Sequence, residues 1–308
     1  MTMSWLPLLS ATVPIDPVTD DFDWSVIPFP VYASPKYDGY RAMVQGGILV
    51  SRNGLAVRNV ELQERYGRPE YEGLDGELCS GAPTSPGVFG RTSSVVKKAT
   101  ADASDTVLWV IDYVDRGGSM LDLRARIGHL QDRIFDRDSV VRIKQTFIKD
   151  VVVLKAYEAK CLSQGYEGVM LRRADQGVYP QKPGKQNRST LNEFYLARLK
   201  RFEHDDAVIV AFHPLKHNLN TERTATGARS SKKAGKVIDA EGRVGSVTLR
   251  DVKTGVEFDT TVGAEALRTW NGWHRAIGKM VRYKYQVCGT KDKPRINTCA
   301  FDELGVTR

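Results

Sequence analysis

Five short runs in this chain place charged residues inside an apolar stretch or at its end. The runs are SPKYDGYR from residue 34, LDGEL from 74, VIDYVD from 110, YEGVML from 166 and LARLKRF from 196. Burying an unpaired carboxylate costs several kcal/mol, so acidic residues in such runs need a partner. Divalent metals, ribose hydroxyls or lysines could supply one. This requirement constrains the fold more than any other feature of the sequence.

Composition places the chain among soluble globular proteins of one or two domains. Its 308 residues are 41% hydrophobic, and the apolar residues are spread along the chain, which excludes disordered, collagen-like and coiled-coil classes. The formal net charge of +8 favours polyanionic partners, although solubility alone could explain it. No uncharged apolar run approaches the roughly 18 residues of a membrane-spanning helix, and no basic residue precedes the short apolar stretch at the N-terminus. We therefore expect no membrane partner and a cytoplasmic protein.

Cysteines and histidines do not form a metal-binding pattern. His213 and His217 lie four residues apart but have no cysteine or carboxylate motif beside them, which favours a structural or exposed pair over a zinc site. The cysteines are too scattered for a metal knuckle, and a reduced cytosolic state explains them: Cys79, Cys161, Cys288 and Cys299.

Hydrophobic periodicity predicts an α+β chain. Up to about residue 202 strands mix with helices, and residues 39–54 predict a hairpin around two consecutive glycines. Residues 155–164 have helical spacing, and Gly165 is expected to end that helix. From residue 203 onward several short strands surround one helical stretch, which indicates a small β-barrel.

One segment of this second part, residues 221–236, is rich in Gly, Ser and Thr and strongly basic. Only Glu222 opposes its five cations, which are Arg223, Arg229, Lys232, Lys233 and Lys236. Such a loop can be a solvated insertion or a phosphate-binding loop, and its composition alone does not separate the two interpretations.

The run from Lys36 to Arg41 has the pattern K-x-D-G-x-R, which by itself also fits a strand end followed by a turn. In fixed order with the other four runs, however, it resembles the covalent nucleotidyltransferase superfamily of ATP-dependent DNA ligases, RNA ligases and mRNA capping enzymes. Lys36 to Arg41 resembles the nucleophile motif of that superfamily. The later segments resemble its other motifs: Ser51 to Gly54 the next segment, Leu74 to Leu78 the ribose-contacting motif, Leu108 to Val114 the nucleobase strand, Glu167 to Leu171 the motif of the metal-associated glutamate, and Arg198 to Lys200 the phosphate-contacting pair.

Two further segments resemble DNA ligases in particular. Residues 179–190 match a segment that precedes the basic pair in those enzymes, with Tyr179, Gly184, Arg188 and Ser189 at the matching positions. The C-terminal part resembles the OB-fold domain of small viral and bacterial DNA ligases. This resemblance implies a nucleotidyltransferase (adenylation) domain of antiparallel sheets with flanking helices over residues 1–202, an OB-fold DNA-binding domain over 203–308, and a monomer in the cytoplasm of a bacterium or a virus-infected host cell.

The resemblance also implies the reaction and its residues. ATP would adenylylate Lys36, AMP would pass to the 5′-phosphate of nicked double-stranded DNA, and the 3′-hydroxyl would displace AMP, with Mg²⁺ or Mn²⁺ as the metal. The implied catalytic residues are Lys36, Asp38, Arg41 and Lys200. The implied nucleotide-binding residues are Ser34, Lys36, Arg41, Arg52, Glu77, Trp109, Val169, Arg198 and Lys200. Metal binding is implied for Glu167, Asp75 and Asp112, and DNA binding for Arg52, Arg188, Arg223, Arg229, Lys232, Lys233, Lys236 and Arg295.

The chain departs from the family pattern at a few positions. Ser34 stands where many relatives carry an acidic residue. Strand parity with Asp112 predicts that Leu108 faces the nucleobase and that Trp109 lies on the opposite face. Candidates for orienting pyrophosphate are Lys291, Lys293 and Arg295. Because attack requires a neutral amine, we also predict a lowered pKa for Lys36.

Two other functions remain to be weighed against a DNA ligase of repair, replication or recombination. A capping-type guanylyltransferase or an RNA ligase would use the same lysine chemistry. A non-catalytic OB-containing binder would have a decayed site, but every charged motif position in this chain is occupied by a chemically competent side chain.

Overall fold

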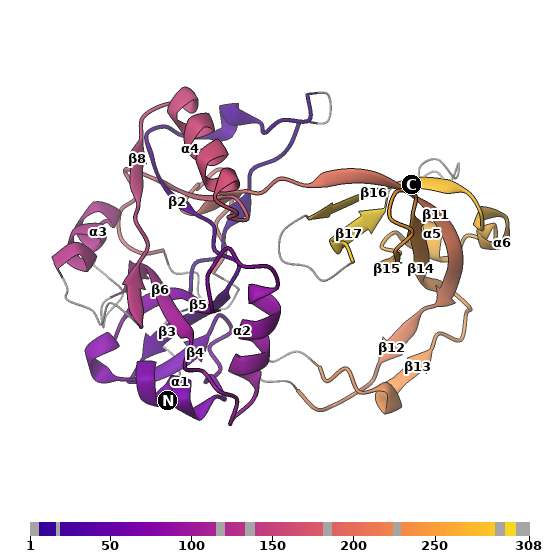
Figure 1. Ribbon diagram of the computed structural model, residues 1–308, viewed down its shortest axis with the longest axis horizontal. Coiled ribbons are helices and arrows are strands. Elements are labelled where there is room, and N and C mark those ends of the chain that lie inside the picture. Colours follow the sequence, from indigo (N-terminus) through magenta and orange to yellow (C-terminus); the bar gives the residue numbers. More distant parts are fainter. Residues whose placement is uncertain are drawn as a thin grey trace. The chain divides into compact units, whose positions relative to one another are not determined.

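Antiparallel pairing dominates the sheets of this α+β chain, as the sequence predicts. The computed structural model describes residues 6–16, 19–114, 121–132, 139–180, 187–223, 229–286 and 293–299, with the side chains of 295–298 left out. The chain divides into two compact units, Met1–Lys200 and Arg201–Arg308 (Figure 1). Within the described residues no helix is long and apolar enough to cross a membrane.

The first sheet of the first unit has the strand order β4-β3-β5-β6-β7. Its strands are β3 (Tyr40–Gln45), β4 (Ile48–Ser51), β5 (Leu74–Ser80), β6 (Thr106–Tyr113) and β7 (Val140–Arg142), and the helices of this region are α1 (Val60–Tyr66), α2 (Val88–Lys97) and α3 (Leu123–Asp132). The predicted hairpin is confirmed as β3 and β4. Gly46 and Gly47, at φ +61° and +71°, form its turn, a conformation that glycine adopts without strain.

The two faces of this sheet have opposite character. Leu74 and Leu78 of β5 pack into an apolar core together with Leu108 and Val110 of β6. Asp75 and Glu77 alternate with them and therefore lie on the other face. The polar face of β5 is thus fixed by the burial of its apolar face.

A bulge in β6 overturns the expected orientation of Trp109. Gly76 pairs with Val110 but Asp75 pairs with Asp112, so one extra residue, Ile111, sits between them in β6. Because of this insertion Trp109, which pairs with Glu77, lies on the same face as Asp112. Leu108 is fully buried in the core instead. The parity prediction was wrong because parity assumes an unbroken strand.

The second sheet of this unit has the order β1-β10-β9-β2-β8. Its strands are β1 (Ala11–Thr12), β2 (Val31–Pro35), β8 (Thr146–Ile148), β9 (Val169–Arg173) and β10 (Ala197–Leu199). The predicted helix is confirmed as α4 (Val151–Ser163), and Gly165 follows it at φ +84°. Since β2 and β10 both run antiparallel to β9, the end of β2, the start of β9 and the end of β10 lie side by side at one end of the strands.

The second unit is built on one sheet in the order β15-β14-β11-β16-β17, as expected for an OB-fold barrel. Its elements are β11 (Glu203–Pro214), β12 (Lys216–Asn218), β13 (Lys236–Ile238), β14 (Val244–Asp251), β15 (Glu257–Thr261), α5 (Glu265–Arg268), α6 (Trp273–Ala276), β16 (Met280–Gln286) and β17 (Arg295–Cys299). Trp273, Phe258 and Tyr283 are buried in its core. The single helical stretch expected in this unit is two short helices, and β12 and β13 form a separate two-stranded sheet. Short 3₁₀ turns occur at Trp24–Val26, Pro69–Tyr71 and Lys233–Gly235.

We predict that Gly76→Ala destabilises the first unit by about 1–3 kcal/mol, because two strands approach too closely for a side chain there. An added Cβ would lie 2.5 Å from the Trp109 carbonyl oxygen and 3.0 Å from Leu108 Cδ1. The free energy of unfolding in urea would measure the effect. Gly90→Ala in α2, whose Cβ would meet nothing within 4 Å, is the control and should be neutral or slightly stabilising. Equal stability of the two variants would contradict the prediction.

Candidate active site

Glu167 forms ion pairs with two lysines at the strand edge where β2, β9 and β10 meet. Oε2 pairs with Lys36 Nζ and Oε1 with Lys200 Nζ. The Glu167 side chain is only 3% exposed, and Lys200 is 9% exposed, whereas Lys36 is 19% exposed. The carboxylate is therefore almost fully covered, and of the two lysines Lys36 is the more accessible. The structure brings together these three residues from three sequence motifs.

Backbone contacts hold the same three segments in place. The Lys36 amide donates to the Gly168 carbonyl at 2.8 Å, and the Glu167 amide donates to the Lys36 carbonyl at 3.3 Å. A Cβ on Gly168 would lie 2.1 Å from the Leu199 carbonyl oxygen, so only glycine fits between β2 and β10 at this point. The E-G-V pattern thus has a steric cause, because its glycine lets the chain that carries Lys200 approach the chain that carries Glu167.

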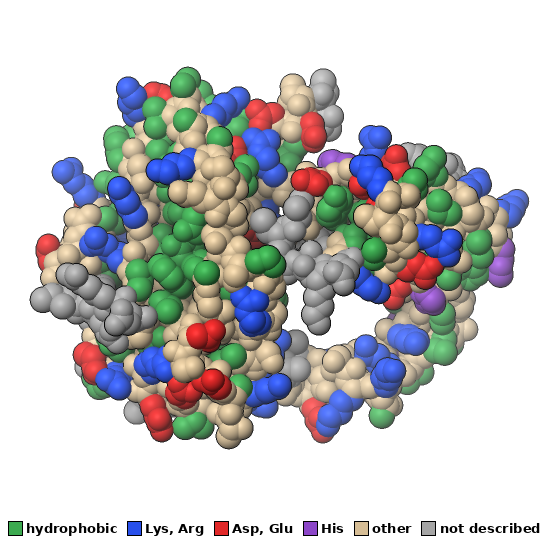
Figure 2. Space-filling model, in the orientation of Figure 1, with side chains coloured by type: hydrophobic (Ala, Val, Ile, Leu, Met, Phe, Trp, Pro, Cys, Tyr) green, Lys and Arg blue, Asp and Glu red, His purple; other side chains and the backbone are tan. Residues whose placement is uncertain are grey.

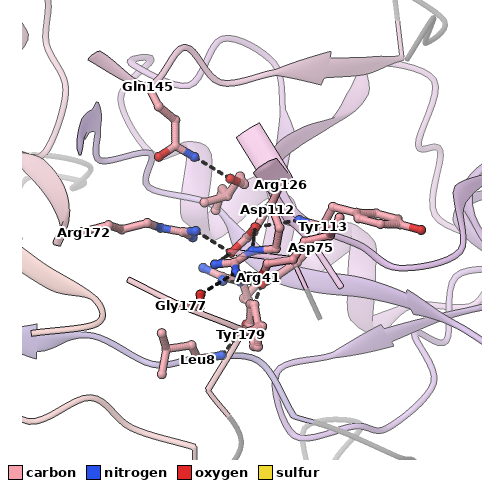
Figure 3. Close-up of polar contacts among 12 residues, drawn as sticks. Leu8, Arg41, Asp75, Asp112, Tyr113, Arg126, Gln145, Arg172, Gly177 and Tyr179 are labelled. Carbon is pink, nitrogen blue, oxygen red and sulfur yellow. Dashed lines mark hydrogen bonds and ion pairs between the residues drawn. The ribbon is translucent and has the colours of Figure 1, made fainter. Parts of the chain in front are cut away.

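Arg41 is fixed by a buried network between the two sheets (Figure 3). Its Nε and Nη2 donate to the two oxygens of Asp75 at 2.6 and 2.7 Å. Tyr179 donates its hydroxyl hydrogen to Asp75 Oδ2 at 2.9 Å, while its oxygen accepts from the Leu8 amide at 2.7 Å. Burial raises the pKa of Tyr179 well above its usual value, which keeps this hydroxyl a donor. The network sets the orientation of the Arg41 guanidinium.

Asp112 lies in a second part of this network, between Arg126 of α3 and Arg172 of β9 (Figure 3). Arg126 donates Nε to Asp112 Oδ1 at 2.9 Å, and Arg172 donates Nη1 to Oδ2. Burial opposes ionisation of Asp112, but the two arginines outweigh it and hold its pKa below the ordinary value. The Arg126 guanidinium also lies 5.5 Å from the Tyr179 ring centroid, which joins the two parts.

These contacts correct the expectation that Asp75 and Asp112 hold a metal. Both carboxylates are fully buried and are neutralised by arginines, so neither offers an oxygen pair to a cation. Within the ranges that the structure describes, no group of three or more His, Cys, Asp or Glu residues could hold a metal ion. Glu167 is the remaining carboxylate of the predicted metal set, and since its two oxygens are paired with Lys36 and Lys200, a metal ion would replace one of these lysines. A site of few carboxylates suits Mg²⁺, which completes its coordination with water and phosphate.

Among the described parts of the chain, three polar atoms of the predicted nucleotide-binding set are buried and have no hydrogen-bond partner there: Glu77 Oε2, Trp109 Nε1 and Arg198 Nε. Glu77 and Trp109 face each other across the β5–β6 ladder. An unsatisfied buried polar atom costs about 1–3 kcal/mol, so natural structures leave few of them unless a ligand or water completes them. The donors and the acceptor therefore fit a polar ligand such as a nucleotide.

Burial also changes the ionisation of two of these residues. It raises the pKa of Glu77 to about 7, although Arg41 and Lys36 act in the opposite direction. Burial and the neighbouring Arg188 lower the pKa of Arg198, which shows that positive charge is concentrated there. An anion placed between Arg188 and Arg198 would relieve this repulsion.

The structure places two predicted nucleotide contacts on opposite faces of the second sheet. Ser34 of β2 pairs with Met170 of β9, and Met170 packs on the same cluster as Met43 and Tyr179, between the two sheets. Val169 instead is fully buried in the core under the other face. Val169 therefore lies on the face away from Ser34, and its neighbour Met170 lies on the face between the two sheets. This placement does not fit the nucleotide contact expected of Val169.

The remaining predicted residues differ in how exposed their side chains are to solvent. Asp38 is buried and lies near enough to Glu77 to influence its charge, whereas Arg52 and Arg188 are exposed. Arg188 donates to the Ser10 carbonyl at 3.1 Å. The side chain of Arg295 falls outside the described residues, as do Gly184, Cys288 and Lys291.

The basic segment from Arg223 to Lys236 ends at the first residue of β13. Arg223 and Arg229 form an isolated antiparallel bridge, and Arg229 donates to the Asn218 carbonyl at 2.9 Å. Lys232 pairs with Glu222, while Lys233 and Lys236 are exposed. Figure 2 shows Lys and Arg side chains gathered over the β12–β13 hairpin. A two-stranded sheet that presents several cations suits an extended polyanion.

The two histidines of the sequence pair contact polar side chains of the second unit. His213 contacts the Thr248 hydroxyl at 2.7 Å, and His217 pairs with Asp239 at 2.6 Å. Of the cysteines, Cys79 and Cys161 are buried.

Several residues of the site were missed by sequence reasoning. Arg172 and Met170 lie in or beside a recognised motif, and correct strand phase would have found them. Arg126 lies on a helix with no motif around it, and nothing in the sequence singles it out as a partner of Asp112.

A pH-dependent stability follows from Glu77. Its pKa is raised in the folded state, so the folded protein keeps a proton that the unfolded chain releases between about pH 4.5 and 7. Stability should therefore fall as pH rises through this window. Glu77→Gln removes this ionisation. As pH rises from 5 to 8, its free energy of unfolding should therefore increase by about 2 kcal/mol relative to that of the unchanged protein. Urea unfolding at both pH values would measure this gain, and a stability difference independent of pH would rule out ionisation of Glu77 as its cause.

Comparison with known proteins gives matches among solved structures. No family model matches the chain, and no curated protein matches it. The DNA ligase–adenylate of Chlorella virus is 27% identical, with 96% of each chain covered and a TM-score of 0.53. A Lig E DNA ligase is 20% identical over 96% of this chain and 98% of its own, with a TM-score of 0.66. The ligase domain of M. tuberculosis LigD is 15% identical over 100% of this chain and 99% of its own, with a TM-score of 0.50.

The two matches of lower identity show the fold, and the viral ligase adds likeness in sequence. All three cover both units of this chain, so the expected nucleotidyltransferase fold followed by an OB-fold is confirmed. Motif order, fold and solved neighbours agree in likening the chain to ATP-dependent DNA ligases, with the likeness in sequence carried by the viral enzyme.

Proposed function

We propose that this protein seals nicks between a 5′-phosphate and a 3′-hydroxyl in duplex DNA, using ATP and a covalent lysyl-AMP intermediate on Lys36. The observation that carries the proposal is the meeting of Lys36, Glu167 and Lys200 in one edge of the second sheet. Residues 1–202 would form the adenylation domain and 203–308 the DNA-binding domain. An RNA ligase or capping-type enzyme is not favoured, because the solved neighbours are DNA ligases.

Lys36 would act as the nucleophile on the α-phosphate of ATP. Only the neutral amine attacks, and the contact with Glu167 favours the charged form, so the nucleophile must lose its proton before attack. Glu167 would hold Mg²⁺ or Mn²⁺, which supplies charge stabilisation at the phosphate oxygens. Phosphoryl transfer needs little from the protein beyond alignment and charge stabilisation, and a site of lysines, arginines and a carboxylate paired with two of the lysines suits it. The lowered pKa of Lys36 stays a prediction.

The AMP group would be held by the residues whose polar atoms lack partners. Glu77 would accept from the ribose hydroxyls, and Arg198 and Lys200 would meet the phosphate. Trp109 and Met170, from the facing sheets, would meet the nucleobase, with Ser34 beside Met170. Arg41 keeps its guanidinium fixed on Asp75 and would present its remaining nitrogen, Nη1, to phosphate or nick.

DNA would be bound through its backbone, because a ligase must accept any sequence at the nick. Arg52 and Arg188 are exposed on the first unit, and the cations from Arg223 to Lys236 are presented by the second. We further propose a monomer in the cytoplasm of a bacterium or a virus-infected host cell, acting in DNA repair, replication or recombination.

The first test is covalent labelling with α-labelled ATP or GTP in the presence of Mg²⁺. We expect label from ATP on the unchanged protein, release of that label as nicked DNA is sealed, and loss of at least about a thousandfold in Lys36→Ala, because the nucleophile is removed. Lys97→Ala, an exposed change on α2, is the matched control and should label normally. Label from GTP alone, or undiminished label in Lys36→Ala, would refute the proposal.

The second test concerns the basic segment from Arg223 to Lys236. If its lysines neutralise phosphates, the logarithm of the association constant for nicked duplex should fall linearly with the logarithm of the salt concentration. The double variant Lys233→Gln, Lys236→Gln should lower the magnitude of that slope by about 2. Binding titrations between low and high salt would measure the slope. Lys97→Gln is the control. A segment that is merely solvated would leave the slope of the double variant unchanged.

A further inference from the structure

Tyr37 lies between Lys36 and Asp38, and its ring contacts aromatic rings from two other elements. The ring centroid lies 5.1 Å from that of Trp109, in an edge-to-face arrangement at 68°. On the other side it lies 5.2 Å from Tyr166, stacked at 17°. Neither tyrosine has a role in the motif pattern of the sequence. Tyr37 directly follows the candidate nucleophile Lys36, and Tyr166 directly precedes the candidate metal ligand Glu167. The three rings therefore connect both segments with β6.

The contact with Trp109 has a consequence for ligand binding. The β5–β6 ladder fixes the backbone of Trp109 opposite Glu77, but it does not fix the side-chain rotamer. Aromatic pairs prefer edge-to-face or offset-stacked geometry, so the Tyr37 ring restricts the orientation of the indole. The Trp109 Nε1 hydrogen is buried and has no acceptor among the residues that the structure describes, so no described hydrogen bond holds the indole. Tyr37 is the aromatic neighbour whose contact with the indole the structure describes.

We propose that Tyr37 is a positioning residue for the nucleotide, which acts by holding the indole of Trp109 in the orientation that receives the nucleobase. The inference rests on the proposed function, because it requires Trp109 to face the bound nucleotide. It adds a residue to the site that touches neither phosphate nor metal in that proposal.

The ring of Tyr37, and not its hydroxyl, should carry this role. Burial and the neighbouring Tyr166 raise the pKa of Tyr37 well above its usual value, so the hydroxyl keeps its proton at physiological pH and does not give it up to Lys36. A phenylalanine keeps both ring contacts. The conservative variant therefore separates orientation of Trp109 from any acid–base role.

The experiment measures the rate of Lys36 adenylylation against ATP concentration. Tyr37→Leu should raise the KM for ATP about tenfold with kcat changed by less than about threefold, and Tyr37→Phe should restore the unchanged KM. If Tyr37 acts through the indole, Tyr37→Leu should have little further effect in a Trp109→Leu background, as a double-mutant cycle would show. Tyr113→Leu is the control. Tyr113 lies on the same strand as Trp109 but stacks on His129 and packs on the opposite face, so its KM should not change.

Each other outcome overturns the inference. An unchanged KM in Tyr37→Leu, additive effects with Trp109→Leu, or a Tyr37→Phe variant as impaired as Tyr37→Leu would each do so. Thermal unfolding checks the fold of every variant, and Tyr37→Met, which keeps bulk without a ring, replaces Tyr37→Leu should the latter unfold. Absence of adenylate on the unchanged protein would overturn the proposed function itself, and this result is distinct from a variant that matches an active parent.

Discussion

Buried carboxylates in the first unit must be paired with cations, and the arrangement of its two sheets satisfies that requirement. Asp75 binds Arg41, and Asp112 binds Arg126 and Arg172. Removing one partner of such a buried pair costs about 3–5 kcal/mol, because the remaining charge is left in a low-dielectric interior. The pair between Asp112 of β6 and Arg172 of β9 joins the two sheets, so they are held together by a specific ion pair as well as by apolar contact. The same network fixes Arg41, a residue of the nucleophile motif.

The site differs from this network in leaving polar atoms unsatisfied. Asp75 and Asp112 are fully paired, whereas Glu77 and Trp109 on the same face have buried atoms without partners. The paired residues hold the structure, and the unpaired ones lower its stability in the absence of a ligand. Binding of a nucleotide that satisfied them would recover that free energy. Along β5 and β6, residues that stabilise the fold thus alternate with residues whose polar atoms are left for a ligand.

Sequence reasoning located the chemistry better than it located the side chains. The convergence of Lys36, Glu167 and Lys200 follows from motif order, and the hairpin at Gly46 and Gly47 from turn chemistry. The orientation of Trp109 did not follow, because one inserted residue in β6 reverses strand parity and leaves no trace in local composition. The assignment of Asp75 and Asp112 to a metal failed for a different reason. Their arginine partners lie far away in sequence, and only the tertiary fold brings them into contact.

Glu167 shows why two lysines are useful at a site where one is consumed. In the proposed reaction, the Lys36 nitrogen becomes part of a phosphoramidate each time AMP is attached, and it loses its positive charge for the lifetime of the intermediate. If Lys36 were the sole side-chain partner, the buried Glu167 carboxylate would then have no cationic side chain beside it, at a cost of several kcal/mol wherever no metal ion took its place. Lys200 binds the other oxygen and stays charged throughout. The backbone bonds from Lys36 to Gly168 and from Glu167 to Lys36 do not depend on the Lys36 side chain, so they keep the nucleophile in place for the next cycle.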